Sequence, residues 1–282
     1  ESELLMIRGS LLFAVLAGAT GCLAYNDQCQ PLVDNPSERV AFIASGTELY
    51  LDRPNTRHGN NALGQQAADA LVWVFANSDR PADFGVVNGG GLRAEGLCVT
   101  RNIIGAGPLS NGVLHEIMLF GNLAQAVDLS EAQVYAMFEH SVERLFPSSE
   151  VIASPAGSFL QVSDAVELHV DCALPAGSRI TSLKIGGETL TTPGRPIEQK
   201  AFRVATSDYI LKGSDGYTML DGVRDDASRN LSTAQRFAGI DSNITAAYLK
   251  QSAFNSTVGE GFKVDASRIT FANCAVPARP SN

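Results

Sequence analysis

A glycine-rich loop, Asn88 to Arg93, constrains this chain more than any other segment. It follows a short apolar run from Phe84 to Val87, which predicts a buried strand. Consecutive glycines have no side chains to pack, so the backbone can turn sharply there and approach a bound group closely. An amide at one end and a charged guanidinium at the other suit an oxygen-rich or anionic ligand. The hexapeptide alone leaves open a plain glycine turn with a surface arginine.

The acidic composition limits the ligands that such a loop could bind. The chain has 282 residues and a formal net charge of −9. Nucleic acid is not an expected partner, because binding its phosphate backbone requires a basic face. A small anionic ligand is compatible with this charge, since a few converging arginines would set the local field.

The pattern of apolar residues predicts helices and strands that alternate irregularly. A capping-box pattern at Ser130 to Gln133 marks the start of one helix, and Gly186-Gly187 is a typical hairpin turn. Because no regular βαβ repeat is present, we expect an α+β fold, a mixed multilayer α/β sandwich, and not a doubly wound sheet. The expected helices cover residues 61–77, 130–145 and 243–251, and the expected strands cover 84–87, 167–170, 180–185 and 202–205.

Residues 1–30 are typical of an export signal. A basic start and a short apolar run lead to small residues before Cys22, so we expect a signal-like or lipoprotein-like leader. The alternative is an ordinary buried helix. Export implies a periplasmic, cell-surface or secreted protein, linked to a membrane only through a lipid anchor on Cys22. We expect a linker over residues 31–46 that runs into a strand, one domain over 47–270 and a C-terminal tail over 271–282.

The cysteines agree with export. If Cys22 belongs to the leader, the four that remain are Cys29, Cys98, Cys172 and Cys274. An even number is compatible with two disulfides, although the sequence does not choose among the three pairings. Free buried thiols are the alternative.

Several other segments contain side chains that suit a nucleotide. Phe120 and Tyr209 are aromatic rings that could enclose a flat base, and Asp215 could accept hydrogen bonds from ribose hydroxyls. Arg53 and Arg57 could hold phosphate. For the two rings, plain core packing is the alternative.

These segments keep a fixed order along the chain: Leu63 to Ala70, Asn88 to Arg93, Leu119 to Asn122, Phe138 to Val142, Gly157 to Val162 and Ser214 to Tyr217. In this order they resemble the C-terminal domain of the 5'-nucleotidase family, which includes periplasmic UDP-sugar hydrolases and surface ecto-nucleotidases. The resemblance covers most of the chain and implies the mixed α/β sandwich of those domains. The chain departs from the family at Leu119, where a proline is usual, and at Tyr209, where phenylalanine is common.

The resemblance implies a role for each matching position. The base would stack between Phe120 and Tyr209, and Asn122 would contact it. Asp215 would bind the ribose, while three arginines would hold phosphate and ribose groups. The residues that the resemblance assigns to the binding site are Arg53, Arg57, Asn88, Gly90, Arg93, Phe120, Asn122, Gly157, Tyr209 and Asp215. His140 lies in a family motif, and we expect it to have a structural role.

The catalytic motifs of the family are absent from the sequence. In the family, a separate N-terminal domain holds two divalent metal ions with Asp-x-His, Gly-Asn-His and Gly-His-x-His segments, none of which occurs here. We therefore expect no cofactor in this chain and no hydrolysis by it. Three interpretations follow: a recognition domain that works with a separate metallophosphatase domain or chain, a stand-alone exported module that binds nucleotides or nucleosides, and a structural surface protein.

Overall fold

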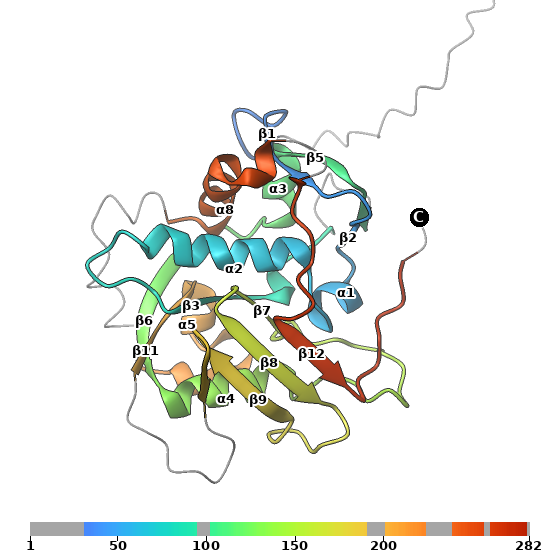
Figure 1. Cartoon of the computed structure of the whole chain (residues 1–282), viewed down its shortest axis with the longest axis vertical. Coiled ribbons are helices and arrows are strands. Elements are labelled where there is room, and N and C mark those ends of the chain that lie inside the picture. Colours follow the sequence, from blue (N-terminus) through green and yellow to red (C-terminus); the bar gives the residue numbers. More distant parts are fainter. Residues whose placement is uncertain (1–30, 95–101, 191–200, 224–238, 257–259, 281–282) are drawn as a thin grey trace, which may run out of the picture.

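The centre of the fold is a sheet of four strands in the order β6-β11-β3-β7. The computed structural model describes residues 31–94, 102–190, 201–223, 239–256 and 260–280 (Figure 1). The strands are β6 (Ala124–Ser130), β11 (Ala201–Ser207), β3 (Phe84–Asn88) and β7 (Leu160–Val162). The inner strands β11 and β3 are parallel, and each outer strand is antiparallel to its neighbour.

A second sheet of four strands has the order β10-β9-β8-β12. It contains β10 (Glu188–Leu190), β9 (Ile180–Ile185), β8 (Val166–Asp171) and β12 (Ile269–Ala272). The hairpin expected at Gly186-Gly187 is confirmed, since it joins β9 to β10 and both glycines have positive φ, as a type I′ turn requires.

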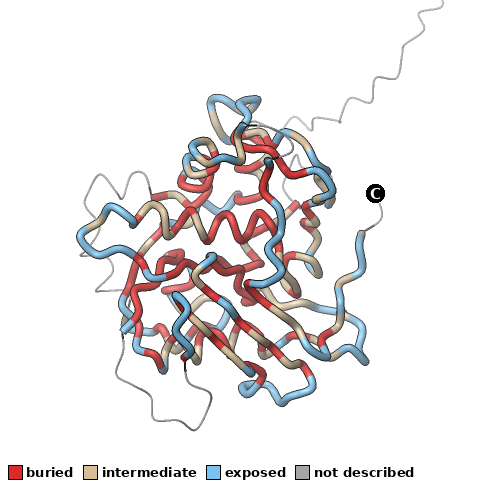
Figure 2. The backbone as a smooth tube through the Cα atoms, in the orientation of Figure 1, coloured by how far each residue is buried: buried red, intermediate tan, exposed pale blue. Residues whose placement is uncertain are grey.

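The central sheet packs on both faces, and its side chains alternate between two cores. Phe84 and Val86 of β3 point into one core, whereas Val87 lies in the other. Helices α2 (Ala62–Phe75), α3 (Asn111–Ile117) and α8 (Asp241–Gln251) cover one face. Helix α4 (Glu131–Val142) and the second sheet cover the other, and both cores are buried (Figure 2). This confirms the mixed α/β sandwich.

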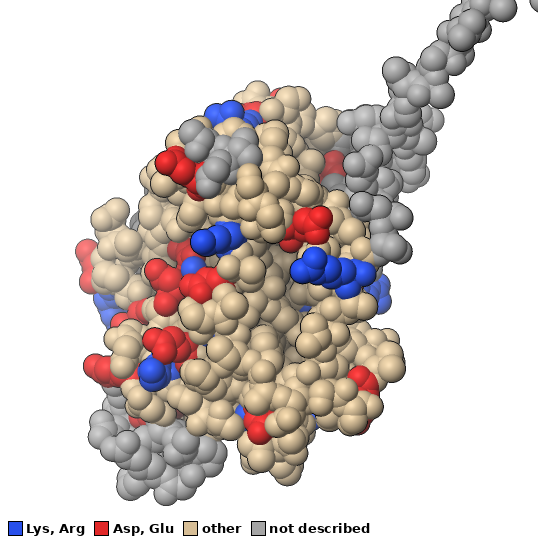
Figure 3. All heavy atoms as spheres, turned by 45° about the vertical axis from the view of Figure 1, so that its right-hand side comes forward, with Lys and Arg blue, Asp and Glu red and all other residues tan. Residues whose placement is uncertain are grey.

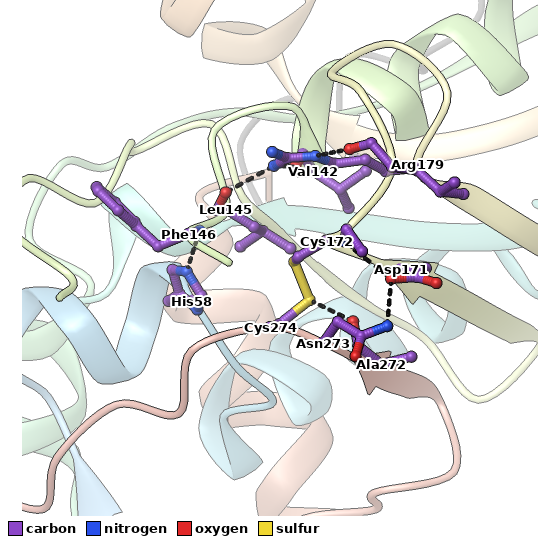
Figure 4. The surroundings of a disulfide bond; sticks show 12 residues. His58, Val142, Leu145, Phe146, Asp171, Cys172, Arg179, Ala272, Asn273 and Cys274 are labelled. Atoms are coloured by element: carbon purple, nitrogen blue, oxygen red, sulfur yellow. Dashed lines mark hydrogen bonds between the residues drawn. A yellow bond between two sulfur atoms is a disulfide. The ribbon is translucent and has the colours of Figure 1, made fainter. Parts of the chain in front are cut away.

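Helices α2 and α4 begin where the sequence predicts. The Asn61 side chain accepts hydrogen bonds from the backbone N–H groups of Leu63 and Gly64 at the start of α2. At the start of α4, Ser130 and Gln133 form the expected capping box. At the end of α4, the guanidinium of Arg179 donates to backbone carbonyls of the last turn and of the loop that follows (Figure 4).

One disulfide joins Cys172, which follows β8, to Cys274, which follows β12 (Figure 4). The two strands are parallel neighbours, so the crosslink closes the chain next to their carboxyl ends. This supplies one of the pairings that the sequence left open. Cys22, Cys29, Cys98 and the expected leader lie outside the described residues.

Two expected boundaries are wrong. The segment 31–46, expected to be a linker, contains β1 (Arg39–Ile43), which is largely buried and pairs with β5 (Gly107–Ser110). The tail expected to begin at residue 271 contains the end of β12 and Cys274 of the disulfide. The packed domain therefore extends past both limits, because short strands at the chain ends pair with partners far away in the sequence. Within the described ranges, no helix is long and apolar enough to cross a membrane.

Candidate functional site

Most of the expected site residues lie together at one edge of the central sheet, where its four strands begin or end. The inner strands β3 and β11 end there, and the outer strands β6 and β7 begin there, since Ser207 pairs with Ala124 and Asn88 pairs with Leu160. The loops that leave or enter the four strands therefore meet at this edge. Ligands of mixed and parallel α/β sheets commonly bind at the carboxyl ends of such strands.

These loops form a pocket of about 160 Å³. Helix α1 (Arg53–Arg57) adds a side chain to it from one side. The pocket contains every residue expected from the sequence except Arg53, and Gly91 in addition. Its lining residues are Arg57, Asn88, Gly90, Gly91, Arg93, Phe120, Asn122, Gly157, Tyr209 and Asp215. Arg53 is exposed at the first position of α1 and does not line the pocket.

The glycine loop is shaped by close packing against other backbone segments. A Cβ atom on Gly89 would lie 2.0 Å from the carbonyl oxygen of Thr56, and one on Gly90 would lie 2.9 Å from Cα of Gly157. The Gly90 N–H also donates to the Gly157 carbonyl at 3.0 Å. The expectation that these glycines have no packing role is therefore wrong for Gly89, because a larger residue would separate the loop from α1.

Asp215 is the centre of a polar network in the pocket. Its two carboxylate oxygens accept hydrogen bonds from Nδ2 of Asn88 at 2.9 Å and from the hydroxyl of Tyr209 at 3.1 Å. Its backbone is left-handed, with a φ of 54°. The Asp215 carbonyl lies 2.8 Å from Nε2 of His140, which places His140 behind the network. Burial, with the nearby Asp215 carboxylate, raises the pKa of Tyr209, so its hydroxyl remains a donor at neutral pH.

Two arginines line the pocket. The Arg93 guanidinium lies over the Phe120 ring, with Cζ 4.7 Å from the ring centre, and its Nε donates to the Gly90 carbonyl at 2.9 Å. Arg57 donates to the Pro155 carbonyl at 3.4 Å. The Phe120 and Tyr209 rings, 46% and 36% exposed, keep apolar surface in contact with solvent.

The loop that carries Phe120 and Asn122 is held from two sides. Asp208, which begins helix α5 (Asp208–Leu211), accepts a hydrogen bond from the Leu123 N–H at 2.8 Å. Asp241 of α8 accepts one from Nδ2 of Asn122 at 3.2 Å. Sequence reasoning missed both carboxylates and the contact of His140 with Asp215. Each acts through a contact with a residue elsewhere in the fold, and no local sequence pattern records such a contact.

The site contains no metal centre that the described residues could supply. Across these ranges, no group of three or more His, Cys, Asp or Glu side chains is close enough to hold a metal ion. On the face shown in Figure 3, acidic and basic side chains are scattered over a largely uncharged surface.

Comparisons with known proteins agree with this fold. The chain is 26% identical over 191 residues to a 5'-nucleotidase from Diplobatis ommata, covering 64% of this chain and 31% of the relative. It is 24% identical over 212 residues to an apyrase from Aedes aegypti, covering 74% and 33%. The chain thus spans about a third of the length of these curated relatives.

A solved structure with the same fold is the 5'-nucleotidase precursor from Thermus thermophilus. It has a TM-score of 0.62 and 24% identity, and the match covers 84% of this chain and 40% of that one. The pattern that defines the family "5'-nucleotidase, C-terminal domain" matches residues 40–222, which include every pocket residue. The chain therefore belongs to the family of 5'-nucleotidase C-terminal domains.

Proposed function

We propose that this domain recognises a nucleotide or nucleoside in the pocket at the edge of the central sheet. The observation that supports the proposal is that residues from several separate elements converge on one pocket. Residues from α1 and from loops next to all four strands of the sheet meet in one pocket, and their side chains combine aromatic, amide, carboxylate and guanidinium groups. A structural surface protein would have no need for such a set.

The base is proposed to stack on Phe120 and Tyr209. Both rings are partly exposed and line the pocket, so a bound base would cover apolar surface that now contacts water. Asp215 is proposed to bind ribose hydroxyls. Each of its carboxylate oxygens accepts one side-chain hydrogen bond and keeps a lone pair that a hydroxyl could use.

Arg57 and Arg93 are proposed to hold the phosphate groups. Both line the pocket, and a guanidinium can bind phosphate through two parallel hydrogen bonds. Arg93 would also contact the base-binding ring, because it stacks on Phe120. Arg53 leaves the proposed binding set, since it lies outside the pocket.

The chemistry of hydrolysis is proposed to reside on another domain or chain that carries two divalent metal ions. The present domain would then bind and orient the substrate. We also propose an exported location, which the Cys172–Cys274 disulfide supports because disulfides persist in oxidising compartments. A relative from Listeria monocytogenes is named a cell wall protein.

Isothermal titration of the purified chain with AMP, adenosine and UDP-glucose tests the proposal. We expect saturable binding of at least one ligand, which Tyr209→Ala should weaken. Binding of none of them by the folded chain would overturn it and favour the structural interpretation. A parallel assay of phosphate release with added manganese or zinc should remain negative. Release that persists on repurification would locate a metal centre in this chain.

A further inference from the structure

One pocket residue, Asn122, is oriented by a buried carboxylate that does not itself line the pocket. Nδ2 of Asn122 donates to Oδ2 of Asp241 at 3.2 Å, and the Asp241 N–H donates to the Asn122 carbonyl at 2.9 Å. Asp241 is 8% exposed and begins α8, 119 positions further along the chain. Two segments far apart in the sequence therefore meet directly behind the pocket.

The chemistry of a carboxylate fixes which way the amide faces. An ionised carboxylate offers only acceptor atoms, so the amide nitrogen of Asn122 must point toward Asp241. Turning the amide over would place Oδ1 of Asn122 against Oδ2 of the buried carboxylate and remove the hydrogen bond that Asn122 donates to it, which is costly. Asn122 then has its carbonyl oxygen and one remaining N–H for a ligand.

Such an amide edge selects among bases. It pairs with a group that presents a donor beside an acceptor, as the N6 amine and the ring nitrogen N1 do on the Watson–Crick edge of adenine. On the same edge, a purine with an oxo group at position 6 presents an acceptor at O6 beside a donor at N1–H, which is the reverse order. It could make both hydrogen bonds only if the Asn122 amide were free to turn over.

We propose that Asp241 is a positioning residue that fixes the amide of Asn122, so that the pocket prefers a base with an exocyclic amine over one with an oxo group at that position. The inference rests on the proposed function, because it takes the pocket to hold a base. It adds the class of base, and it assigns a role to a residue that lies outside the pocket.

The same contact makes the preference depend on pH. Burial raises the pKa of Asp241 to about 6, with the nearby Asp208 adding to the rise. His115 of α3 and hydrogen bonds from Ser242 and Asn122 act in the opposite direction. Below this pH the carboxyl gains a proton and can donate to Oδ1 of Asn122, so the amide can turn over. The preference for an amine should therefore weaken as the pH falls through about 6.

Adenosine and inosine form a matched pair of probes. They differ at position 6, where one carries an amine and the other an oxo group, and neither carries a phosphate that titrates. Isothermal titration of the full chain at neutral pH should give a Kd for adenosine about tenfold lower or more, the discrimination of one well-placed bidentate pair. In Asp241→Asn, a neutral amide of the same shape can donate to the turned Asn122, so the ratio should fall to about threefold or less.

Controls separate the possible outcomes. Asp164→Asn makes the same chemical change on the exposed turn between β7 and β8, and it should keep the wild-type ratio. Thermal melting followed by circular dichroism checks that each variant is folded. If Asp241→Asn does not fold, the wild-type chain at pH 5 gives the answer, because its ratio should fall there without any substitution.

Two results would overturn the inference and leave the proposed function intact. One is equal binding of adenosine and inosine by the wild-type chain at neutral pH. The other is an unchanged ratio in folded Asp241→Asn, or, where that variant does not fold, in the wild-type chain at pH 5. Failure of both nucleosides to bind the folded wild-type chain would remove the proposed function and the inference together.

Discussion

The pocket edge of the central sheet and the disulfide-linked second sheet are built in different ways. The second sheet combines a continuous apolar core with the Cys172–Cys274 crosslink. The pocket edge combines partly exposed rings with carboxylates that hold loops, such as Asp241 behind Asn122. The first arrangement stabilises the fold, whereas the second fixes polar groups in place at a cost in stability. Substitutions in the two regions should therefore affect different measurements.

The largest effect is expected from the disulfide. Replacing Cys172 and Cys274 together by serine should lower the free energy of unfolding by about 4 kcal/mol, because the crosslink spans 102 positions and restricts the unfolded chain strongly. Urea denaturation measures the loss. Adenosine affinity, measured well below the unfolding transition, should stay unchanged. A weaker affinity in the folded variant would show that the two regions are coupled.

The second effect concerns Asp241. Its ionised carboxylate lowers the stability of the folded chain, whereas the disulfide raises it. Its pKa is about 6 in the folded chain and 3.8 ordinarily, so the folded state favours the protonated carboxyl. The stability that this adds is fully present below pH 3.8 and is lost as the pH rises through about 6. As the pH rises from acid to neutral, the free energy of unfolding of the wild-type chain should fall by about 3 kcal/mol relative to that of Asp241→Asn. Urea denaturation across that range tests this, and a constant difference would contradict it.

A smaller effect, on binding alone, is expected from the aromatic rings. Tyr209→Ala should weaken adenosine binding by about 1–3 kcal/mol through lost stacking. Tyr209→Phe keeps the ring and removes the hydroxyl that donates to Asp215, so it separates stacking from the hydrogen bond. Titration calorimetry gives both affinities. If Phe weakened binding as much as Ala, the hydroxyl and not the ring would be the important group.

The smallest effect distinguishes the two arginines of α1. Arg57→Ala should weaken AMP binding by about 1 kcal/mol more than adenosine binding, because it removes a partly screened contact with phosphate. Arg53→Ala makes the same change on the same helix outside the pocket, and it should affect both ligands equally. A selective loss of AMP binding in Arg53→Ala would return that residue to the site.

The sequence predicts the longer elements because their signals are local. The apolar spacing of α2 and the capping box of Ser130 and Gln133 depend on residues a few positions apart. The short strand β5 was missed because its stability comes from pairing with β1 across more than sixty positions, which no local pattern records.

Most of the pocket could be predicted because ordered motifs supply it, and the contacts behind it could not. The motifs place Phe120, Asn122 and Asp215, yet Asp241 and His140 act through tertiary contacts with those residues. Arg53 was misplaced for a related reason. Two arginines four positions apart on one helix look equivalent in the sequence, and only the packing of α1 decides which one reaches the pocket.

The pocket occupies one end of the central strands, and this has a practical consequence for handling the protein. The turn between α2 and β3, at residues 76–83, lies at the other end of β3, which has five residues and is about 17 Å long. An affinity tag or surface tether inserted beside the exposed Asp79 would thus immobilise the protein with its recognition face directed toward the solution.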